Sequence, residues 1–422
     1  MLDIKLVREN PDIIRKDIIK RDMPSTLAKF EELIELDKKW RAALQETEEL
    51  KRQRNVITAE VAKLKKEGKD ITAKLHLVKE IPGKIKELDE RTIQLRMQED
   101  EILMNLPNIL HESVPLGVDD TQNKVEKTWG EKKKYSFTPK SHVDILAQRD
   151  FGDTEKAGEI SGARFYYLKR ELVLLDIALQ KFTLDHMHQK GYILMEPPFL
   201  MRRKPYEGVT SLADFENVMY KIEGEDLYLI ATSEHPIGAY HMNEVVESTR
   251  LPLKYAGISP CFRKEAGSHG KDTKGIFRVH HFNKIEQFVF CKPEESWQIH
   301  EELMKNAEEI VQKLGLHYRI VNVCTGDIGT VAAKKYDLEV WMPVQNAYRE
   351  MMSCSNCTDY QARRLGIKYS EGAKRDFLHT LNSTALATSR AIVALIENCQ
   401  DEKGYIHIPH ALQLYMGGMK KI

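Results

Sequence analysis

A heptad pattern near the start of the chain restricts its fold more than any other feature of the sequence. Ten positions follow one another at alternating spacings of three and four residues, and eight of them are apolar. They are Leu33, Leu36, Trp40, Ala43, Thr47, Leu50, Arg54, Ile57, Val61 and Leu64. Apolar residues that recur in this way form the seam of a coiled coil. The pattern therefore predicts a long helix, roughly 50 Å from end to end at about 1.5 Å per residue.

A second apolar series follows after a short polar break at residues 65–70. It runs through Ile71, Leu75, Val78, Ile81, Ile85, Leu88, Thr92, Leu95, Glu99, Ile102 and Leu106. Because the break contains Gly68, we expect a turn there and an antiparallel helical hairpin over about residues 27–106. Two successive spacings of three residues meet at Val78, and Pro82 follows shortly after. This irregularity predicts a kink or local overwinding of the second helix.

The charges of the hairpin are unevenly distributed. The distal half, residues 51–86, has eleven Lys or Arg against four Asp or Glu, whereas residues 27–50 and 87–106 have six against thirteen. A basic tip suits a phosphate backbone, because each neutralised phosphate releases condensed counterions. The alternative, that the lysines only keep a long helix soluble, stays open from these residues alone. The whole chain has 64 basic and 64 acidic side chains, so its net charge points to no nucleic-acid partner.

The sequence favours a reduced, cytoplasmic protein with no membrane partner. The first ten residues contain no apolar core of the length found in signal peptides. No stretch approaches the roughly 18 apolar residues that a membrane helix needs. The six cysteines are irregularly spaced and predict no disulfide framework. Cys354 and Cys357 form a C-x-x-C pair, but one pair supplies only two ligands for zinc, so we expect plain thiols there.

One block in the second part of the chain combines residue types that suit a nucleotide. Phe262-Arg263-Lys264-Glu265 ends an apolar stretch, a glycine-rich run occupies residues 266–275, and the chain resumes with Arg278-Val279-His280-His281-Phe282 and Asn283-Lys284-Ile285-Glu286. The pattern predicts a hairpin with a mobile loop, bearing Arg-x-Glu on one strand and Phe-x-Lys-x-Glu on the other. An arginine fork can hold a phosphate and a carboxylate together, and an aromatic ring beside it offers a stacking face for a base.

This block resembles the second signature motif of class II aminoacyl-tRNA synthetases, in the form found in seryl-tRNA synthetases. Gly191-Tyr192 with Pro197-Pro198 resembles the first motif, and residues 380–390 resemble the third. Thr232-Ser233-Glu234 is similar to the serine-binding element of the family, and Glu350-Met351-Met352-Ser353 to its ATP- and metal-binding segment. The heptad hairpin matches the tRNA-binding arm. The resemblance thus covers nearly the full length, in the arm-bearing, bacterial-like form.

The resemblance implies a fold, a reaction and partners. The fold is expected to be α+β, with a tRNA-binding helical domain at residues 1–110 that carries the coiled-coil arm. A class II catalytic domain, an antiparallel β-sheet flanked by helices, is expected at residues 111–422, linker included. The implied enzyme is a serine–tRNA ligase that uses ATP and Mg²⁺ to convert L-serine to seryl-adenylate. It then transfers the seryl group to the 3′-terminal ribose of tRNA(Ser), with tRNA(Sec) as a further acceptor. The first motif implies a homodimer.

The motifs also imply a role for each matching residue. The expected catalytic residues are Arg263, which bridges the α-phosphate and the serine carboxylate, Arg390 on the far phosphates, and Glu350, which holds Mg²⁺ with Ser353. The serine site would contain Thr232, Ser233, Glu234, Arg263, Glu286 and Thr384. The ATP site would contain Arg263, Lys264, Glu265, Val279, Phe282, Glu350, Met351, Met352, Ser353 and Arg390. Thr232 and Glu234 would hold the serine amino group, and Glu286 with Thr384 its hydroxyl. Glu265 and the backbone near Val279 would read adenine, with Phe282 stacked against it.

The tip of the arm is expected to contact tRNA through Lys63, Lys65, Lys66 and Lys69, since RNA helices are read through phosphates and 2′-hydroxyls. Three other functions compete with this interpretation. A catalytically silent paralogue would have lost Arg263, Glu286 or Arg390, and all three are present. A ligase that loads an amino acid onto a carrier protein usually lacks the long arm. A coiled-coil scaffold would account for residues 27–106 and nothing beyond them.

Overall fold

The computed structural model describes residues 1–210, 218–265 and 274–422, so most of the predicted glycine-rich loop, residues 266–273, lies outside the described residues. The chain divides into two compact units, Leu2–Leu106 and Pro107–Ile422, and Met1 belongs to the second. Among the described helices, none combines the length and the apolar character that crossing a bilayer requires.

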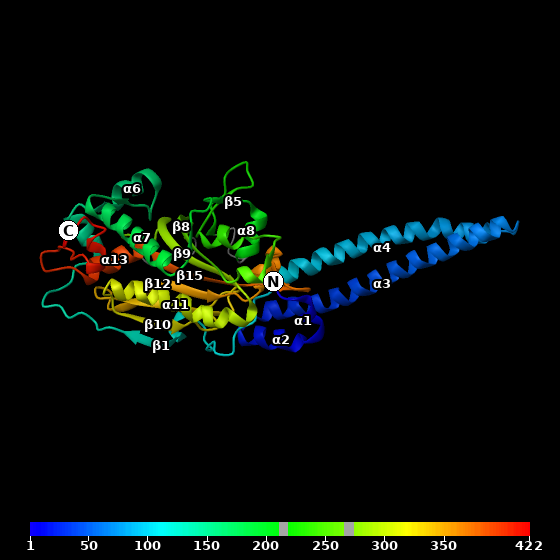
Figure 1. The fold of residues 1–422 in the computed structure, drawn as a ribbon, viewed down its shortest axis with the longest axis horizontal. Coiled ribbons are helices and arrows are strands. Elements are labelled where there is room, and N and C mark those ends of the chain that lie inside the picture. Colours follow the sequence, from blue (N-terminus) through cyan, green and yellow to red (C-terminus); the bar gives the residue numbers. More distant parts are fainter. Residues whose placement is uncertain (211–217, 266–273) are drawn as a thin grey trace. The chain divides into compact units, whose positions relative to one another are not determined.

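The first unit consists of four helices (Figure 1). Helices α1 (Ile4–Glu9) and α2 (Pro11–Lys20) precede the long helices α3 (Pro24–Lys66) and α4 (Thr72–Asn105). The predicted hairpin is confirmed, because α3 and α4 pack against each other along their length. Asp70 fixes the start of α4, since its carboxylate accepts hydrogen bonds from the backbone N–H (2.9 Å) and the hydroxyl (2.6 Å) of Thr72.

The seam of the hairpin follows the predicted positions with one exception. Leu75 is 38% exposed, and the preceding residue, Lys74, whose side chain is exposed to the same fraction, is the one that reaches across the hairpin, where it is ion-paired with Glu60. The prediction of Leu75 as a seam residue is therefore wrong. With Lys74 in its place, the spacing of three and four residues is unbroken from Ile71 onward, because the lysine stem can cover apolar surface while its ammonium group stays in water. Helix α4 continues through Pro82.

Acidic side chains buried near the base of the hairpin have arginine partners. Asp37 accepts hydrogen bonds from Arg8 (2.6 Å) and Arg41 (2.9 Å), and Glu99 accepts one from Arg96 (3.1 Å). Burial raises the pKa of Glu99, and the positive charge of Arg96 offsets only part of this effect.

The second unit is built on an eight-stranded sheet. Its strands lie in the order β1 (Lys124–Trp129), β10 (Tyr318–Asn322), β11 (Lys334–Met342), β12 (Ala347–Asn356), β15 (His379–Ala387), β9 (His281–Cys291), β8 (Leu253–Phe262) and β4 (Ile193–Met195). Every neighbouring pair is antiparallel except β4 and β8, which are parallel. The predicted α+β class with an antiparallel sheet and flanking helices is confirmed, and the edge strand β4 makes the sheet mixed.

Three long helices cover the sheet: α7 (Glu171–Gln189), α11 (Ser296–Lys313) and α13 (Thr388–Asn398) (Figure 1). Their apolar faces share one core with the strands. The shorter helices are α5 (His142–Gln148), α6 (Thr154–Ser161), α8 (Arg203–Val209), α10 (Glu234–Gly238), α12 (Tyr360–Leu365) and α14 (His410–Gln413). Short 3₁₀ turns lie at Asp120–Gln122, Ser248–Arg250 and Pro293–Glu295. The small strands are β2 (Gly152–Asp153), β3 (Tyr167–Leu168), β5 (Leu200–Met201), β6 (Tyr228–Leu229), β7 (Val245–Glu247), β13 (Lys368–Glu371) and β14 (Lys374–Phe377).

The predicted linker after the hairpin is an integral part of the second unit. Strand β1 pairs with β10 at the edge of the large sheet. The loop before β1 is held by backbone hydrogen bonds from Thr325 to Pro115 (3.0 Å) and from Gly326 to Gly117 (2.9 Å). These bonds place the following residues, Asp120 and Asn123, in the wall of a cavity described below.

Candidate active site

Two cavities of the second unit share part of their walls. The smaller encloses about 120 Å³ and is lined by Thr232, Glu234, Arg263, Phe282, Lys284, Glu286, Glu350, Met351, Ser353, Asn382, Thr384, Ala387 and Arg390. The larger encloses about 570 Å³ and is lined by Asp120, Asn123, Phe277, Arg278, Asp327, Lys335, Asp337, Glu339, Tyr348, Arg349, Glu350 and Arg390. Because Glu350 and Arg390 line both, the cavities meet at these two side chains.

The alternation of strand β9 explains how the smaller cavity forms. Phe282, Lys284 and Glu286 occupy every second position, so their side chains emerge on one face of the sheet. Gln287, the residue after Glu286, points to the opposite face, where its amide donates to the backbone oxygen of Leu303 in α11 (3.1 Å). Strand register then places Thr384 of β15 directly opposite Glu286. Lys284, itself buried, forms an ion pair with Glu286 at the floor of the cavity.

Glu234 is a second, half-buried carboxylate in the wall of the smaller cavity. Its Oε1 accepts hydrogen bonds from the side-chain amides of Asn382 (3.1 Å) and Gln361 (3.4 Å). Burial and the nearby negative charge of Glu286 raise the pKa of Glu234 to about 7. A cation placed beside Glu234 would favour its charged form, so this cavity suits an ammonium group.

Close packing beneath the smaller cavity fixes the Thr232-Ser233-Glu234 segment. Ser233 is fully buried, and its hydroxyl donates to the backbone oxygen of Gly257 in β8 (3.1 Å). A Cβ atom at Gly257 would lie 2.3 Å from Cδ1 of Ile237 and 2.8 Å from Oγ of Ser233, so only glycine permits this approach. Ser233 therefore supports the segment from below, while Thr232 and Glu234 face the cavity.

Arg263 projects into the smaller cavity immediately after β8. Its backbone N–H donates to the oxygen of His280 (2.9 Å), and Nδ1 of His280 lies 2.7 Å from the oxygen of Arg263. The Nε atom donates to the backbone oxygen of Ala231 (3.3 Å), and the guanidinium carbon is 5.3 Å from the ring centre of Phe282. These contacts orient the guanidinium group and leave it within the wall of the cavity.

The junction of the two cavities concentrates charge. Nη1 of Arg390, on α13, donates to the backbone oxygen of Glu350 (2.8 Å) and lies 3.4 Å from its carboxylate. Burial alone would raise the pKa of Glu350, but the positive charges of Arg390, Lys335 and Arg263 outweigh it and lower the pKa to about 2. Glu350 is therefore ionised at any physiological pH.

The residues near Glu350 fit a magnesium ion. Mg²⁺ usually takes one or two protein carboxylates and completes its shell with phosphate oxygens and water. Glu350 and Ser353 both face the smaller cavity, and strand register places Asp337 directly opposite Ser353. Oδ1 of Asp337 is buried without a hydrogen-bond partner among the described residues. No group of three or more His, Cys, Asp or Glu in the described part of the chain is arranged to hold an ion by itself, so phosphate oxygens would have to complete the shell.

Aromatic and cationic side chains alternate in the wall of the larger cavity. The guanidinium carbons of Arg349 and Arg390 lie 4.4 and 5.2 Å from the ring centre of Phe277. Arg278, the next residue, forms an ion pair with Glu265 (3.0 Å). Two arginines over one aromatic ring and a third beside it suit a polyphosphate with an attached base.

The structure brings most of the predicted site residues together. Thr232, Glu234, Arg263, Phe282, Glu286, Glu350, Met351, Ser353, Thr384 and Arg390 all line the smaller cavity. Five predicted residues line neither cavity. Val279 and Met352 are buried in the core, Ser233 lies beneath the cavity, and Lys264 is exposed. Glu265 is ion-paired with Arg278, which lines the larger cavity.

Other wall residues were not predicted as functional. Lys284 and Asn382 lie within quoted motifs but are given no role there, and alternation along β9 would have indicated Lys284. Lys335, Asp337 and the linker residues have no motif that marks them, because tertiary packing alone brings them to the cavity.

The predicted tRNA-contacting lysines lie in the helical unit. Lys63, Lys65 and Lys66 occupy the last turn of α3, and Lys69 follows in the turn with an ion pair to Glu67 (2.8 Å). All four are exposed.

Known proteins resemble both units. Residues 218–399 match the family described as tRNA synthetase class II core domain (G, H, P, S and T), and residues 1–110 match the seryl-tRNA synthetase N-terminal domain. The chain is 53% identical to the serine–tRNA ligase of Methanocella arvoryzae over the full length of both. The seryl-tRNA synthetase of Pyrococcus horikoshii, solved with ATP, superimposes with a TM-score of 0.97 at 48% identity, covering 100% of this chain and 99% of that one. The cytoplasmic serine–tRNA ligase of Naegleria fowleri, solved with AMP, gives 0.92 at 38% identity, covering 100% and 98%.

Proposed function

This chain belongs to the seryl-tRNA synthetase family of class II aminoacyl-tRNA synthetases, and we propose that it activates L-serine with ATP and transfers the seryl group to tRNA(Ser). The observation that carries the proposal is the pair of cavities that meet at Glu350 and Arg390. The smaller has the size and the carboxylates for an amino acid, and the larger has the arginines for a nucleotide. An acyl group in the smaller cavity and a phosphoryl group in the larger cavity would meet and react beside these two side chains.

Serine would bind with its ammonium group between Thr232 and Glu234 and its hydroxyl at Glu286 and Thr384. The ammonium would keep Glu234 ionised, because an opposite charge lowers a pKa that burial has raised. The hydroxyl would donate to the Glu286 carboxylate, which Lys284 already holds in place. Alanine lacks the hydroxyl that would donate to Glu286, and a site built to hydrogen-bond a substrate hydroxyl can reject an analogue without it by about 10⁴ to 10⁵.

ATP would bind in the larger cavity with its α-phosphate at the junction. There the serine carboxylate oxygen would attack the α-phosphorus, forming the P–O bond of seryl-adenylate as pyrophosphate leaves. Arg263 would contact both the attacking carboxylate and the α-phosphate, which stabilises charge that develops in the transition state. Arg390 would hold the outer phosphates. Mg²⁺ at Glu350 and Ser353 would neutralise phosphate charge.

No side-chain nucleophile is required in either step. In the second step a hydroxyl of the 3′-terminal ribose of tRNA would attack the acyl carbon, and AMP would leave with the electrons of the acyl–phosphate bond. The protein therefore acts by orienting reactants and by placing charge, which can supply a large part of the rate enhancement.

We propose residues 1–110 as the tRNA-binding domain and residues 111–422 as the catalytic domain. The exposed lysines at the tip of the hairpin support backbone contacts to tRNA, because each contact would displace counterions. An enzyme of protein synthesis with six unpaired cysteines, five of them buried, fits the reducing cytoplasm.

We also propose that the chain forms a homodimer. Val173, Leu174 and Ile177 are exposed on α7, at 38, 46 and 56%, and Ile193 and Leu194 are exposed on β4, at 54 and 42%. Strand β4 is an edge of the large sheet and follows α7 directly in the chain. An apolar helix face beside an open sheet edge supports an interface between two copies.

ATP–pyrophosphate exchange without tRNA, tried with each of the twenty amino acids, tests the proposal. We expect exchange with serine alone. A folded protein that binds ATP but exchanges with no amino acid would instead favour the catalytically silent paralogue. Exchange with a different amino acid would refute the assignment of the smaller cavity.

A further inference from the structure

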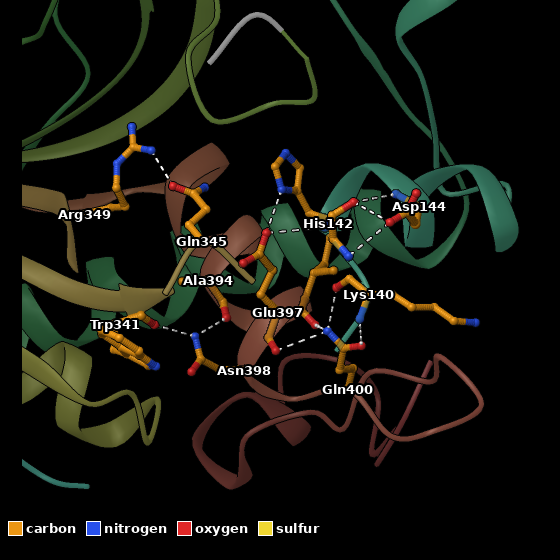
Figure 2. A network of polar contacts seen from close by, with 12 residues as sticks. Lys140, His142, Asp144, Trp341, Gln345, Arg349, Ala394, Glu397, Asn398 and Gln400 are labelled. Carbon is orange, nitrogen blue, oxygen red and sulfur yellow. Dashed lines mark hydrogen bonds and ion pairs between the residues drawn. The ribbon is translucent and has the colours of Figure 1, made fainter. Parts of the chain in front are cut away.

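A buried imidazole–carboxylate pair lies behind the active site and takes no part in the proposed reaction. His142 is the first residue of α5 and Glu397 is near the end of α13, and their side chains are 7% and 1% exposed. Nδ1 of His142 lies 2.9 Å from Oε1 of Glu397, and the backbone N–H of His142 donates to the same oxygen (3.4 Å). Figure 2 shows the two side chains facing each other at the junction of the two helices.

The segment around His142 is also held by Gln400, two residues beyond the end of α13. Lys140 and Gln400 exchange two hydrogen bonds of 2.8 Å each, one in either direction. Ser141 and Asp144 form a capping box that fixes the first turn of α5 (Figure 2 shows Asp144 beside His142). The position of the imidazole is therefore set by the end of α13 and not by α5 alone.

The other ring nitrogen of His142, Nε2, points to Gly275, two residues before Phe277 in the wall of the larger cavity. A Cβ atom at Gly275 would lie 2.0 Å from Nε2 of His142, so the glycine backbone packs directly on the imidazole. Gly275 has φ +80°, and its neighbours Ile276 and Phe277 are buried. Phe277, two residues on, is the ring that carries the guanidinium groups of Arg349 and Arg390.

Together these contacts form a closed path that begins and ends on α13. Arg390 and Glu397 are seven residues apart on α13, which is about two helical turns, so they lie on the same face. From Glu397 the contacts pass to His142, then to Gly275, along the chain to Phe277, and back to Arg390. A displacement of the imidazole would shift Gly275 and with it the aromatic surface under both arginines.

We propose that His142 and Glu397 are positioning residues of the ATP site, acting through Gly275 on Phe277 and thereby on Arg349 and Arg390. The inference rests on the proposed function, since it assigns ATP to the larger cavity. It specifies that the pair affects the binding of ATP and leaves the serine end, on the far side of Glu350, unchanged.

The test is the KM for ATP and for serine, with kcat, in serine-dependent pyrophosphate exchange by the full chain. The first variant is Gly275→Ala, whose methyl group would collide with the imidazole. Its control is Gly315→Ala, because Gly315 has a similar φ of +70° with no heavy atom within 4 Å of the added Cβ. We expect Gly275→Ala to raise the KM for ATP about tenfold. Gly315→Ala should change it by less than about twofold.

The decisive variant is His142→Asn. Its amide can still donate to Glu397, but the shorter side chain cannot reach Gly275. Alone, His142→Asn should raise the KM for ATP about fivefold and leave the KM for serine unchanged. Combined with Gly275→Ala, it should reverse most of the increase in the KM for ATP that Gly275→Ala causes. The matched control is His186→Asn, since His186 is a buried histidine paired with Glu309 (3.3 Å) that lines neither cavity.

If the wild type shows no exchange with serine, the proposed function is refuted, and the Kd for ATP of the same variants, measured without serine, then decides this inference. The inference is overturned if His142→Asn leaves the KM for ATP at the wild-type value, or if it changes the KM for serine to the same extent. It is also overturned if the effects of His142→Asn and Gly275→Ala add without any rescue. If Gly275→Ala does not fold, His142→Asn against His186→Asn decides alone.

Discussion

Glu99 in the helical hairpin is fully buried and Glu350 in the candidate active site is 43% exposed, both lie beside an arginine, and their pKa values move in opposite directions. Burial raises the pKa of Glu99, because Arg96 is its main cationic neighbour and Asp37 opposes it. Three cations, Arg390, Lys335 and Arg263, overcome the burial of Glu350 and lower its pKa to about 2. One close arginine therefore leaves the pKa of the Glu99 carboxyl raised, whereas two arginines and a lysine keep Glu350 an anion that can hold a metal ion.

The hairpin and the candidate active site also differ in how far along the sequence the partners of their acidic side chains lie. Arg96 is three residues from Glu99, and Arg41 is four from Asp37, so both pairs lie on one face of a helix. In the active site Glu234 is bonded to Gln361 and Asn382, which are 127 and 148 residues away. Local periodicity governs the hairpin, and the topology of the sheet governs the site.

The largest effect that would sharpen this comparison is expected for Arg263→Ala. It removes the group proposed to contact both the attacking carboxylate and the α-phosphate, so serine-dependent pyrophosphate exchange should fall by about 10³ or more. The control is Arg41→Ala, which removes one of two arginine partners of Asp37 in the hairpin and should leave exchange unchanged. Exchange within tenfold of the wild type, from folded Arg263→Ala, would contradict the role of Arg263.

The next largest effect concerns the two halves of the hairpin. Lys63, Lys65 and Lys66 changed together to Glu should lower kcat/KM for tRNA about 100-fold at low salt, because each phosphate contact contributes to the salt dependence of binding. Exchange without tRNA should be unaffected. The matched variant changes Lys29, Lys38 and Lys39, which are exposed in the proximal half. Equal losses of charging in the two triple variants would show that total charge matters and the tip does not.

A smaller effect is expected from pH at the serine site. Because the pKa of Glu234 is about 7, the ionised fraction rises about tenfold between pH 6 and 8, and the KM for serine should fall by a similar factor. Glu234→Gln should have a high KM that does not vary over this range. A wild-type KM that is constant from pH 6 to 8 would contradict the ammonium-binding role.

Glu234 also has a defined effect on stability. Folding raises its pKa from 4.5, so the folded protein holds this proton more tightly and loses stability as the pH rises from about 4.5 to 7. Glu234→Gln should therefore be at least as thermostable as the wild type at pH 8. A lower melting temperature for the variant would show that the carboxylate stabilises the fold.

The smallest effect tests the register of the seam. Leu75→Lys should change the stability of the hairpin by less than about 0.5 kcal/mol, as is usual for a surface substitution. Lys74→Leu should add about 1 kcal/mol by burying apolar surface. Amide hydrogen exchange in α4 measures both. A loss above about 2 kcal/mol in Leu75→Lys would place Leu75 back in the seam.

The hairpin was predictable from sequence because its contacts repeat at fixed spacings. The same rule produced the one wrong seam position, Leu75. Leu75 was chosen over Lys74 because the pattern counts apolar residues, but a lysine stem can occupy a seam position. The preference for an unbroken spacing of three and four would have selected Lys74.

The active site was predictable only where a motif identified it. Arg263, Glu286, Glu350 and Arg390 belong to recognisable blocks, and the structure brings them together. Gln361, Lys335 and Asp337 reach the site through strand pairing and packing over long sequence distances. No local pattern encodes these contacts, so they could be found only from the fold.

The most direct test of the central claim is a crystal structure with Mg²⁺ and a non-hydrolysable sulfamoyl analogue of seryl-adenylate. The seryl ammonium should lie within hydrogen-bond distance of Glu234, its hydroxyl at Glu286, and the sulfamoyl group at Arg263. The nucleoside should extend into the larger cavity beyond Glu350 and Arg390. A seryl group outside the smaller cavity, or a nucleoside on the other side of Glu350, would contradict the account.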